Sequence, residues 1–232
     1  VQSTGAQHVV MLVDPSTYTQ GMANRLRHSL RAAGVHVSTI PITEGKASYR
    51  TEVDLALSKN PDLLYVSTYF PEGSKIADEL DGVRSRARQS VCLMGLANVD
   101  PGFVAEAGIA AAQGCLFSGI PEAGQLPYGR ARTYVSDYQA AFHRNPGVWG
   151  TFAYDSMMLL ARAIDGAGAT SYAQVLNRLL HTTRYLGATG SITIDPATGN
   201  RQVLPIDIML VNEAGAFEPL LAHCRFRARM VC

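Results

Sequence analysis

Two tyrosines with polar neighbours are the residues of this sequence best suited to chemistry. Tyr18 closely follows the apolar run 8–13, and Tyr69 ends a second apolar run over 62–69. A tyrosine ring offers apolar area to a ligand, and its hydroxyl can hold a polar group in place. This chemistry is reversible binding of a small molecule, and it makes or breaks no bond.

Hydroxyl side chains accompany both tyrosines. Ser16 and Thr17 stand at the start of a predicted helix, where such residues usually cap the first turn. In a second interpretation, the free N–H groups of that helix start face an anionic group of the ligand. Thr68, next to Tyr69, offers a hydroxyl either to a ligand or to the backbone. Both interpretations stay open for each residue.

Signatures of catalysis and of metal binding are missing from the sequence. It holds no G-x-S-x-G, H-E-x-x-H, Walker-type or complete dinucleotide-binding motif. Its four cysteines form no C-x-x-C pair, and its six histidines are scattered. The sequence therefore predicts a protein that is not an enzyme and uses neither a metal nor another cofactor.

The cysteines fall into two groups. Cys224 and Cys232 flank an arginine-rich tail and are candidates for a disulfide, which would indicate an oxidising compartment. Cys92 and Cys115 lie in apolar runs, a pattern typical of plain buried thiols.

Composition narrows the class of partner. The 232 residues are 47% hydrophobic and 17% charged, with a net charge of +1, which suits one large domain or two small ones. This balance gives no reason to expect nucleic acid as a partner. No apolar stretch reaches the roughly 18–20 residues of a membrane span, so we expect no direct insertion of this chain into a membrane.

The first half of the chain alternates apolar runs with helical patterns. Continuous apolar runs are typical of strands buried on both faces, so we predict a doubly wound parallel α/β sheet flanked by helices. Tyr18 and Tyr69 would then follow the carboxyl ends of strands, where such sheets bind small molecules. The expected strands are 7–13, 35–42, 62–69, 90–96 and 115–120, and the expected helices are 18–33, 50–59, 74–86 and 101–112.

The second half has a different character. A connection rich in glycine and proline covers 120–132, and three helices are expected over 132–144, 151–167 and 171–182, followed by short strands at 190–194 and 206–211. Amphipathic helices must bury their apolar sides. Either these helices cover the first sheet, or their natural partner is absent from this chain.

Several stretches together resemble a known family. They include Val-Met-Leu-Val-Asp-Pro-Ser-Thr-Tyr18, Asn60-Pro-Asp-Leu-Leu-Tyr-Val-Ser-Thr-Tyr69, Val148-Trp-Gly-Thr-Phe-Ala-Tyr-Asp155 and Tyr185-Leu-Gly-Ala-Thr-Gly-Ser-Ile-Thr-Ile-Asp195. In order and spacing they resemble type I periplasmic solute-binding proteins, of the group that binds branched-chain amino acids and amides. The resemblance covers nearly the whole chain, as the later two-thirds of a family member.

The resemblance implies two α/β lobes that clamp a ligand between them. It assigns residues 1–120 to a ligand-binding lobe, 121–203 to a helical remnant of the other, incomplete lobe, and 204–232 to a strand and tail that pack back on the first. The chain would be an extracytoplasmic fragment, lacking the N-terminal part of the first lobe, that delivers a polar or amphipathic solute to the membrane subunits of an ABC-type importer. The alternative is the ligand-sensing domain of a receptor or regulator.

The resemblance also assigns residues to the cleft. Tyr18 and Tyr69 match cleft tyrosines, and Trp149 lies near a segment that reaches the cleft, although core or interface packing is the more usual role of such a residue. Amino-acid binders of the family carry an acidic residue in the loop after the fourth strand, and no carboxylate stands at the matching place here. Asp100 is better interpreted as a helix N-cap before a proline. Asn98 would instead favour an amide, a hydroxyl or another neutral polar group.

Overall fold

The structure is a computed structural model, and it describes residues 5–83, 91–168 and 170–220. The chain divides into two compact units. Unit 1 contains the residues up to 119 together with those from 207 on, and unit 2 is Ile120–Ile206. The assignment of residues 121–203 to a second lobe stays a prediction. The candidate disulfide partners Cys224 and Cys232 lie outside the described residues.

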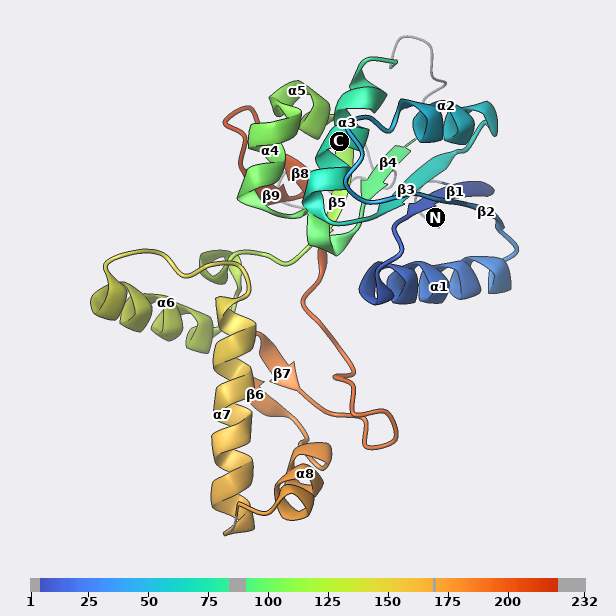
Figure 1. Cartoon of the computed structure of the whole chain (residues 1–232). Helices are drawn as coiled ribbons and strands as arrows, with labels where there is room; N and C mark the ends of the chain where they lie inside the picture. Colours follow the sequence, from blue (N-terminus) through green and yellow to red (C-terminus); the bar gives the residue numbers. More distant parts are fainter. Residues whose placement is uncertain (1–4, 84–90, 169, 221–232) are drawn as a thin grey trace. The chain divides into compact units, whose positions relative to one another are not determined.

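Unit 1 is built on a seven-stranded sheet with the order β2-β1-β3-β4-β5-β8-β9 (Figure 1). Its first five strands run parallel, whereas β8 and β9 join antiparallel at one end. The predicted doubly wound α/β fold with a mostly parallel sheet is therefore confirmed. The strands are β1 His8–Val13, β2 His36–Pro41, β3 Leu63–Ser67, β4 Val91–Met94, β5 Cys115–Gly119, β8 Asp207–Val211 and β9 Phe217–Pro219.

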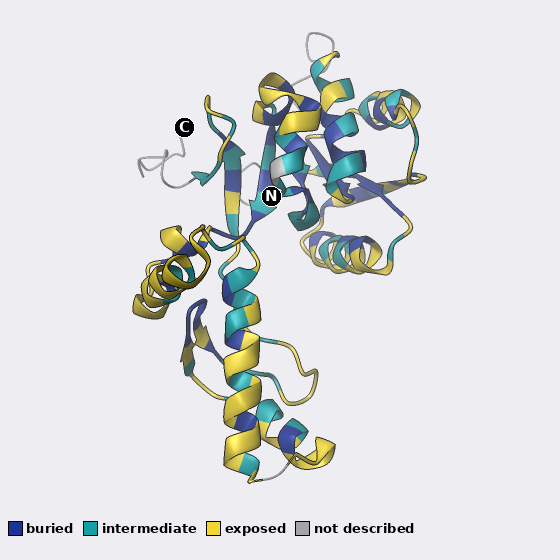
Figure 2. Ribbon diagram, turned by 60° about the vertical axis from the view of Figure 1, so that its left-hand side comes forward, coloured by how far each residue is buried: buried dark blue, intermediate teal, exposed yellow. Residues whose placement is uncertain are grey.

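Helices cover both faces of this sheet. The helix α1 packs on one face, where its residues Ala23 and Leu30 meet Val9, Met11 and Val13 of β1. The helices α2, α3, α4 and α5 lie on the opposite face (Figures 1 and 2). Each of them contributes side chains to a larger buried cluster there. The helical elements of unit 1 are α1 Thr17–Ala32, α2 Arg50–Ser58, α3 Phe70–Asp81, the 3-10 turn η1 Leu96–Asn98, α4 Pro101–Ala107 and α5 Ile109–Gln113.

Glycines decide two helix boundaries. Gly34 has a φ of +78° and ends the first helix, as the sequence predicts. The single helix expected over 101–112 is instead two helices, because Gly108 has a φ of +80° and interrupts the run. The helix α3 begins at Phe70, earlier than the predicted residue 74, with a proline in its first turn.

Cys92 and Cys115 are not free thiols, and that prediction is wrong. The two residues are register partners on the neighbouring parallel strands β4 and β5, with their Cα atoms 4.6 Å apart, and they form a disulfide. Both are buried, as expected. The register between β4 and β5 brings the two cysteines together. Neither apolar run shows this register when it is considered alone.

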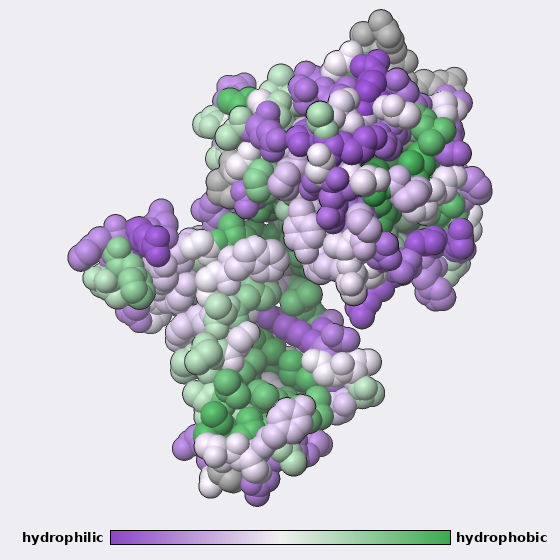
Figure 3. Space-filling view, in the orientation of Figure 1, coloured by the Kyte–Doolittle hydropathy of each residue, from purple (hydrophilic) through white to green (hydrophobic). Residues whose placement is uncertain are grey.

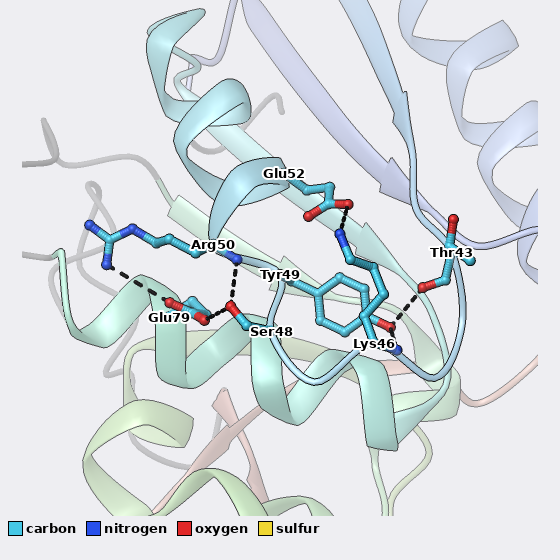
Figure 4. A network of polar contacts seen from close by, with 7 residues as sticks. All are labelled: Thr43, Lys46, Ser48, Tyr49, Arg50, Glu52 and Glu79. Carbon is cyan, nitrogen blue, oxygen red and sulfur yellow. Dashed lines mark hydrogen bonds and ion pairs between the residues drawn. The ribbon is translucent and has the colours of Figure 1, made fainter.

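A polar network fixes the loop between β2 and α2 (Figure 4). The fully buried Tyr49 donates its hydroxyl to the carbonyl of Thr43 at 2.9 Å. Ser48 donates to Glu79 of α3 at 2.5 Å, and Arg50 lies 3.8 Å from the same carboxylate. The start of α2 is thus tied to the body of α3.

Unit 2 contains helices and one small hairpin. Its elements are the 3-10 turn η2 Ala123–Gln125, α6 Gly129–Phe142, α7 Gly150–Ala167, α8 Tyr172–Leu180, β6 Tyr185–Gly187 and β7 Gly190–Ile192. The helices α7 and α8 contact each other, and β6 pairs antiparallel with β7. Among the described residues, no helix is long and apolar enough to cross a membrane.

A buried carboxylate joins α7 to the hairpin. Asp155 is 2% exposed and accepts hydrogen bonds from the amides of Ala188 and Thr189 at 2.7 and 2.8 Å, and from the Thr189 hydroxyl at 2.6 Å. Arg201 donates to the carbonyl of Thr189 at 2.8 Å. A side chain at Gly187 would place its Cβ 2.5 Å from the Asp155 carboxylate, so this close approach requires glycine. Hydrogen bonds to the Asp155 carboxylate thus hold the hairpin of β6 and β7 against α7.

Candidate functional site

The two tyrosines lie together at the point where the sheet order reverses. β1 sits between β2 and β3, and the helices that follow β1 and β3 pack on opposite faces of the sheet. A crevice opens at such a switch point beyond the carboxyl ends of the strands, and it is the usual ligand site of this architecture. Tyr18 lies in the first turn of α1, and Tyr69 is the residue before α3.

The two rings are close and accessible. Their centroids are 6.1 Å apart with an angle of 40° between the planes, a tilted pair. Tyr18 is 41% exposed and Tyr69 is 44% exposed, so each residue is partly covered by protein and partly open to solvent. The rings therefore form an aromatic surface suited to an apolar group.

A third tyrosine stands behind this pair. Tyr65, on β3, is 4% exposed. Burial raises the pKa of the Tyr18 hydroxyl above its ordinary value, and the neighbouring Tyr65 and Tyr69 raise it further. Tyr18 therefore stays a neutral hydroxyl at physiological pH and can either donate or accept a hydrogen bond.

The loop that leads into α1 is organised by Asp14, a role that the sequence did not reveal. Asp14 follows β1 directly, is 1% exposed, and accepts hydrogen bonds from the amide of Ser16 at 2.9 Å and from the hydroxyl of Thr19. Its own amide donates to the carbonyl of Ser67 at 3.2 Å, which ties the end of β1 to the end of β3. An aspartate two residues before an N-cap is the signal that could have found it.

Ser16 is the N-cap of α1, one of its two predicted roles. Its hydroxyl accepts a hydrogen bond from the amide of Thr19 at 3.2 Å. Thr17 is exposed and begins the helix. Within the described part of the chain, the amides of Thr17 and Tyr18 have no hydrogen-bond partner, as is usual for a first helical turn. These two N–H groups lie beside the tyrosine pair.

Thr68 and Asn98 lie beneath the surface. Thr68 is 1% exposed, and Asn98 is fully buried. The Asn98 amide donates to the carbonyl of Thr68 at 2.9 Å and to that of Gly95 at 3.3 Å. These bonds join the loop after β3 to the loop after β4, so Asn98 positions the segment that carries Tyr69. A direct contact of either side chain with a solute stays a prediction, and their burial gives it no support.

The start of α3 accommodates this asparagine through a glycine. A Cβ at Gly73 would lie 1.8 Å from the Asn98 side-chain oxygen, so the first turn of α3 can pack here only without a side chain. Glu72 accepts a hydrogen bond from the amide of Gly45 at 3.1 Å, and Lys75 donates to the carbonyl of Lys46 at 3.0 Å. Tyr69 thus stands on a helix start that is braced on two sides.

Two further residues named in the sequence analysis, Asp100 and Trp149, are distant from the tyrosine pair in the sequence. Asp100 is the N-cap of α4, as predicted, and accepts from the amide of Gly102 at 2.7 Å. Trp149 belongs to unit 2, precedes α7 and is 53% exposed, with its ring centroid 6.0 Å from that of Phe152. Its place in a ligand cleft stays a prediction. The described residues contain no group of histidine, cysteine and acidic side chains arranged to hold a metal ion.

Comparison with known proteins identifies the relatives of this chain. The family model described as periplasmic binding protein matches residues 1–216. A Leu/Ile/Val-binding protein of Rhizobium johnstonii is 25% identical over 189 residues, which are 81% of this chain and 50% of the relative. The chain thus spans about half the length of this curated relative.

Solved structures agree on the fold. A leucine-binding protein of Thermotoga maritima superposes with a TM-score of 0.80 at 24% identity, covering 93% of this chain and 60% of that one. A branched-chain amino-acid transporter substrate-binding protein of Streptococcus pneumoniae, solved in complex with isoleucine, gives a TM-score of 0.74 at 24% identity, covering 94% of this chain and 60% of that one. The family model and these structures confirm the resemblance found in the sequence.

Proposed function

The chain belongs to the periplasmic binding protein family, and from that premise we propose that it is part of a solute-binding protein that delivers a small polar or amphipathic molecule to an ABC-type importer. The observation that carries this proposal is the pair of half-exposed rings of Tyr18 and Tyr69, 6.1 Å apart at the switch point of the sheet. A solute with an apolar body would lie against these rings.

The polar groups at the site favour a neutral or anionic head over a positively charged one. The start of α1 offers the exposed hydroxyl of Thr17 and the two unpartnered amides of Thr17 and Tyr18 next to the Tyr18 ring. Asp14 supplies the carboxylate of the loop after β1. This carboxylate is buried and already accepts two hydrogen bonds. An ammonium group would find no exposed counter-charge among the residues 14–19 and 67–70. We therefore propose an amide-like or amino-acid-like solute whose amide or carboxylate group, and not an ammonium group, is held by these residues through hydrogen bonds from neutral groups.

The proposed location is extracytoplasmic, in keeping with the family. The disulfide between Cys92 and Cys115 supports it, because such bonds persist in oxidising compartments and are rare in the cytosol. Membrane subunits of an importer would be the protein partner.

Calorimetric titration of the complete protein tests the proposal. A first panel of branched-chain amino acids, their amides and short aliphatic amides identifies the solute by its heat of binding. We expect Tyr18→Ala and Tyr69→Ala each to weaken that binding by about tenfold or more, because each removes a large apolar contact surface. Tyr18→Phe and Tyr69→Phe separate the contribution of the hydroxyl from that of the ring.

Tyr172→Ala is the matched control, because Tyr172 is 80% exposed and belongs to unit 2. It should bind the solute like the unsubstituted protein. The proposal fails if both alanine variants at Tyr18 and Tyr69 fold normally and keep the full affinity.

A further inference from the structure

Unit 2 contains a cavity lined by an unusual number of arginines. Its volume is about 710 Å³, within the range of small-molecule pockets. Arg130 of α6, Arg162 of α7, Arg178 of α8 and Arg184 of the turn before β6 all line it. The four residues come from separate segments, and only the fold of unit 2 gathers them.

The positive charge of this cavity is not balanced from within. Asp165 is the one carboxylate among the lining residues. In the described ranges, none of the four arginines makes an ion pair with an acidic side chain. Arginine stays charged at any pH that the protein meets. The chain as a whole carries only a net charge of +1, so this concentration of charge is local.

An aromatic ring orders part of the cluster. Arg130 donates a hydrogen bond to the hydroxyl of Tyr185 at 2.8 Å, and its guanidinium lies 5.3 Å from the ring centroid. The guanidinium of Arg162 lies 5.9 Å from the same centroid. Two cations are thus held against one ring by cation–π attraction, in positions fixed by the fold. Their remaining N–H groups are available to a ligand, because a guanidinium has five donors.

We propose that this cavity is a second binding site, which takes a small molecule that carries two or more carboxylate or phosphate groups. The planar fork of a guanidinium matches both groups with two parallel hydrogen bonds. An anion with several such groups would engage arginines from more than one wall and relieve their mutual repulsion. This site belongs to unit 2 and shares no residue with the tyrosine pair of unit 1.

Isothermal titration of the full chain with citrate and, separately, with inorganic pyrophosphate tests this site at constant ionic strength. We expect saturable binding of at least one of the two anions. If only citrate binds, the site prefers carboxylate groups, and if only pyrophosphate binds, it prefers phosphate groups. Arg162→Gln and Arg178→Gln should each weaken that binding by about tenfold or more, because each removes charge-assisted hydrogen bonds.

Two control variants make the result specific. Arg25→Gln removes an exposed arginine from α1 in unit 1 and should leave anion binding unchanged. Tyr18→Ala should also leave it unchanged, which separates this site from the proposed solute site. Circular dichroism confirms that each variant is folded, and Arg162→Lys, which keeps the charge but loses the fork, replaces Arg162→Gln if the latter unfolds.

Three results would overturn the proposal. The first is the absence of saturable binding of either anion at millimolar concentration. The second is an equal loss of binding in Arg25→Gln, which would indicate a diffuse charge effect. The third comes from a parallel titration with polyglutamate. If polyglutamate binds and neither small anion does, the arginine cluster recognises an acidic protein surface instead.

Discussion

The two units of this chain bury their apolar residues to very different degrees. Unit 1 has a buried cluster on each face of its sheet, and both clusters consist of unit 1 residues. In unit 2, the helix α7 leaves a row of apolar side chains in solvent: Met157 is 64% exposed, Met158 39%, Leu160 38% and Ile164 36%. Figure 3 shows this hydrophobic region over α7 and α8.

This difference indicates how each unit is stabilised. Unit 1 supplies both the sheet and the helices that cover it, whereas unit 2 has helices and only a two-stranded sheet. The exposed row on α7 agrees with the expectation that these helices have a natural partner outside this chain, which stays a prediction. Within unit 2, hydrogen bonds to the buried Asp155 join α7 to the hairpin of β6 and β7.

The largest expected effect contrasts one core residue with one exposed residue. Phe117 is fully buried in unit 1, between the rings of Phe103 and Phe217 at 5.0 Å each. Phe117→Ala should lower the free energy of unfolding by about 3–5 kcal/mol through the cavity it leaves. Met157→Ala should change it by less than about 0.5 kcal/mol. Urea denaturation measures both, and equal losses would break the contrast between the units.

The second effect concerns the disulfide, which only unit 1 contains among the described residues. Cys92 and Cys115 are 23 positions apart, and replacing both by alanine frees this loop in the unfolded chain. We expect a loss of about 3 kcal/mol in the stability of unit 1. We expect calorimetry to show the transition of unit 2 unchanged, and a midpoint for unit 2 lowered as much as that of unit 1 would contradict a loss of stability confined to unit 1.

The third effect tests the hydrogen-bonded anchor of unit 2. Asp155→Asn keeps the shape but loses the charge and one acceptor, so a buried amide or hydroxyl of Ala188 or Thr189 loses its partner. The expected loss is about 1.5–3 kcal/mol, confined to unit 2. The exposed Asp137→Asn on α6 is the control. If the two variants melt alike in calorimetry, the anchor is not what stabilises unit 2.

The smallest effect is an alkaline one in unit 1. Burial raises the pKa of Tyr65, and a hydrogen bond with Ser67 only partly opposes this shift. A raised pKa means that the folded state favours the neutral phenol, so its contribution to stability is complete below the ordinary tyrosine pKa of about 10. That contribution is lost as the pH rises through the folded pKa. Tyr65→Phe should flatten the fall in the urea midpoint above pH 10, and an unchanged slope would contradict this assignment.

The sequence predicts most of unit 1 because its signals are local. The parallel strands β1, β3, β4 and β5 lie in largely apolar runs, and the edge strand β2 alternates between exposed and buried residues, so all five parallel strands are found within a few residues. The strands β6 and β9 have three residues each, and their short sequences carry no periodic signal. The break at Gly108 was missed because the apolar pattern continues through it, although a glycine there allows the positive φ that ends α4.

The geometry around the two tyrosines could be predicted in part, and for a physical reason. Tyr18 and Tyr69 each follow a strand, so sequence position alone places them at the same edge of the sheet. The burial of Asn98 depends on the absence of a side chain at Gly73, a residue 25 positions earlier on another helix. The pairing of Cys92 with Cys115 likewise depends on strand register. Such contacts between distant residues leave no trace in one sequence.

Under the proposed function, the position of the two tyrosines also bears on how this protein could acquire a new solute preference. Tyr18 and Tyr69 stand at the starts of α1 and α3, whose buried residues lie in separate core clusters. Neither ring belongs to these clusters, so replacing one would alter the proposed binding surface while the clusters keep all of their residues. One or two substitutions at the proposed site could therefore change the preferred solute during evolution, while the fold that carries the two tyrosines stays the same.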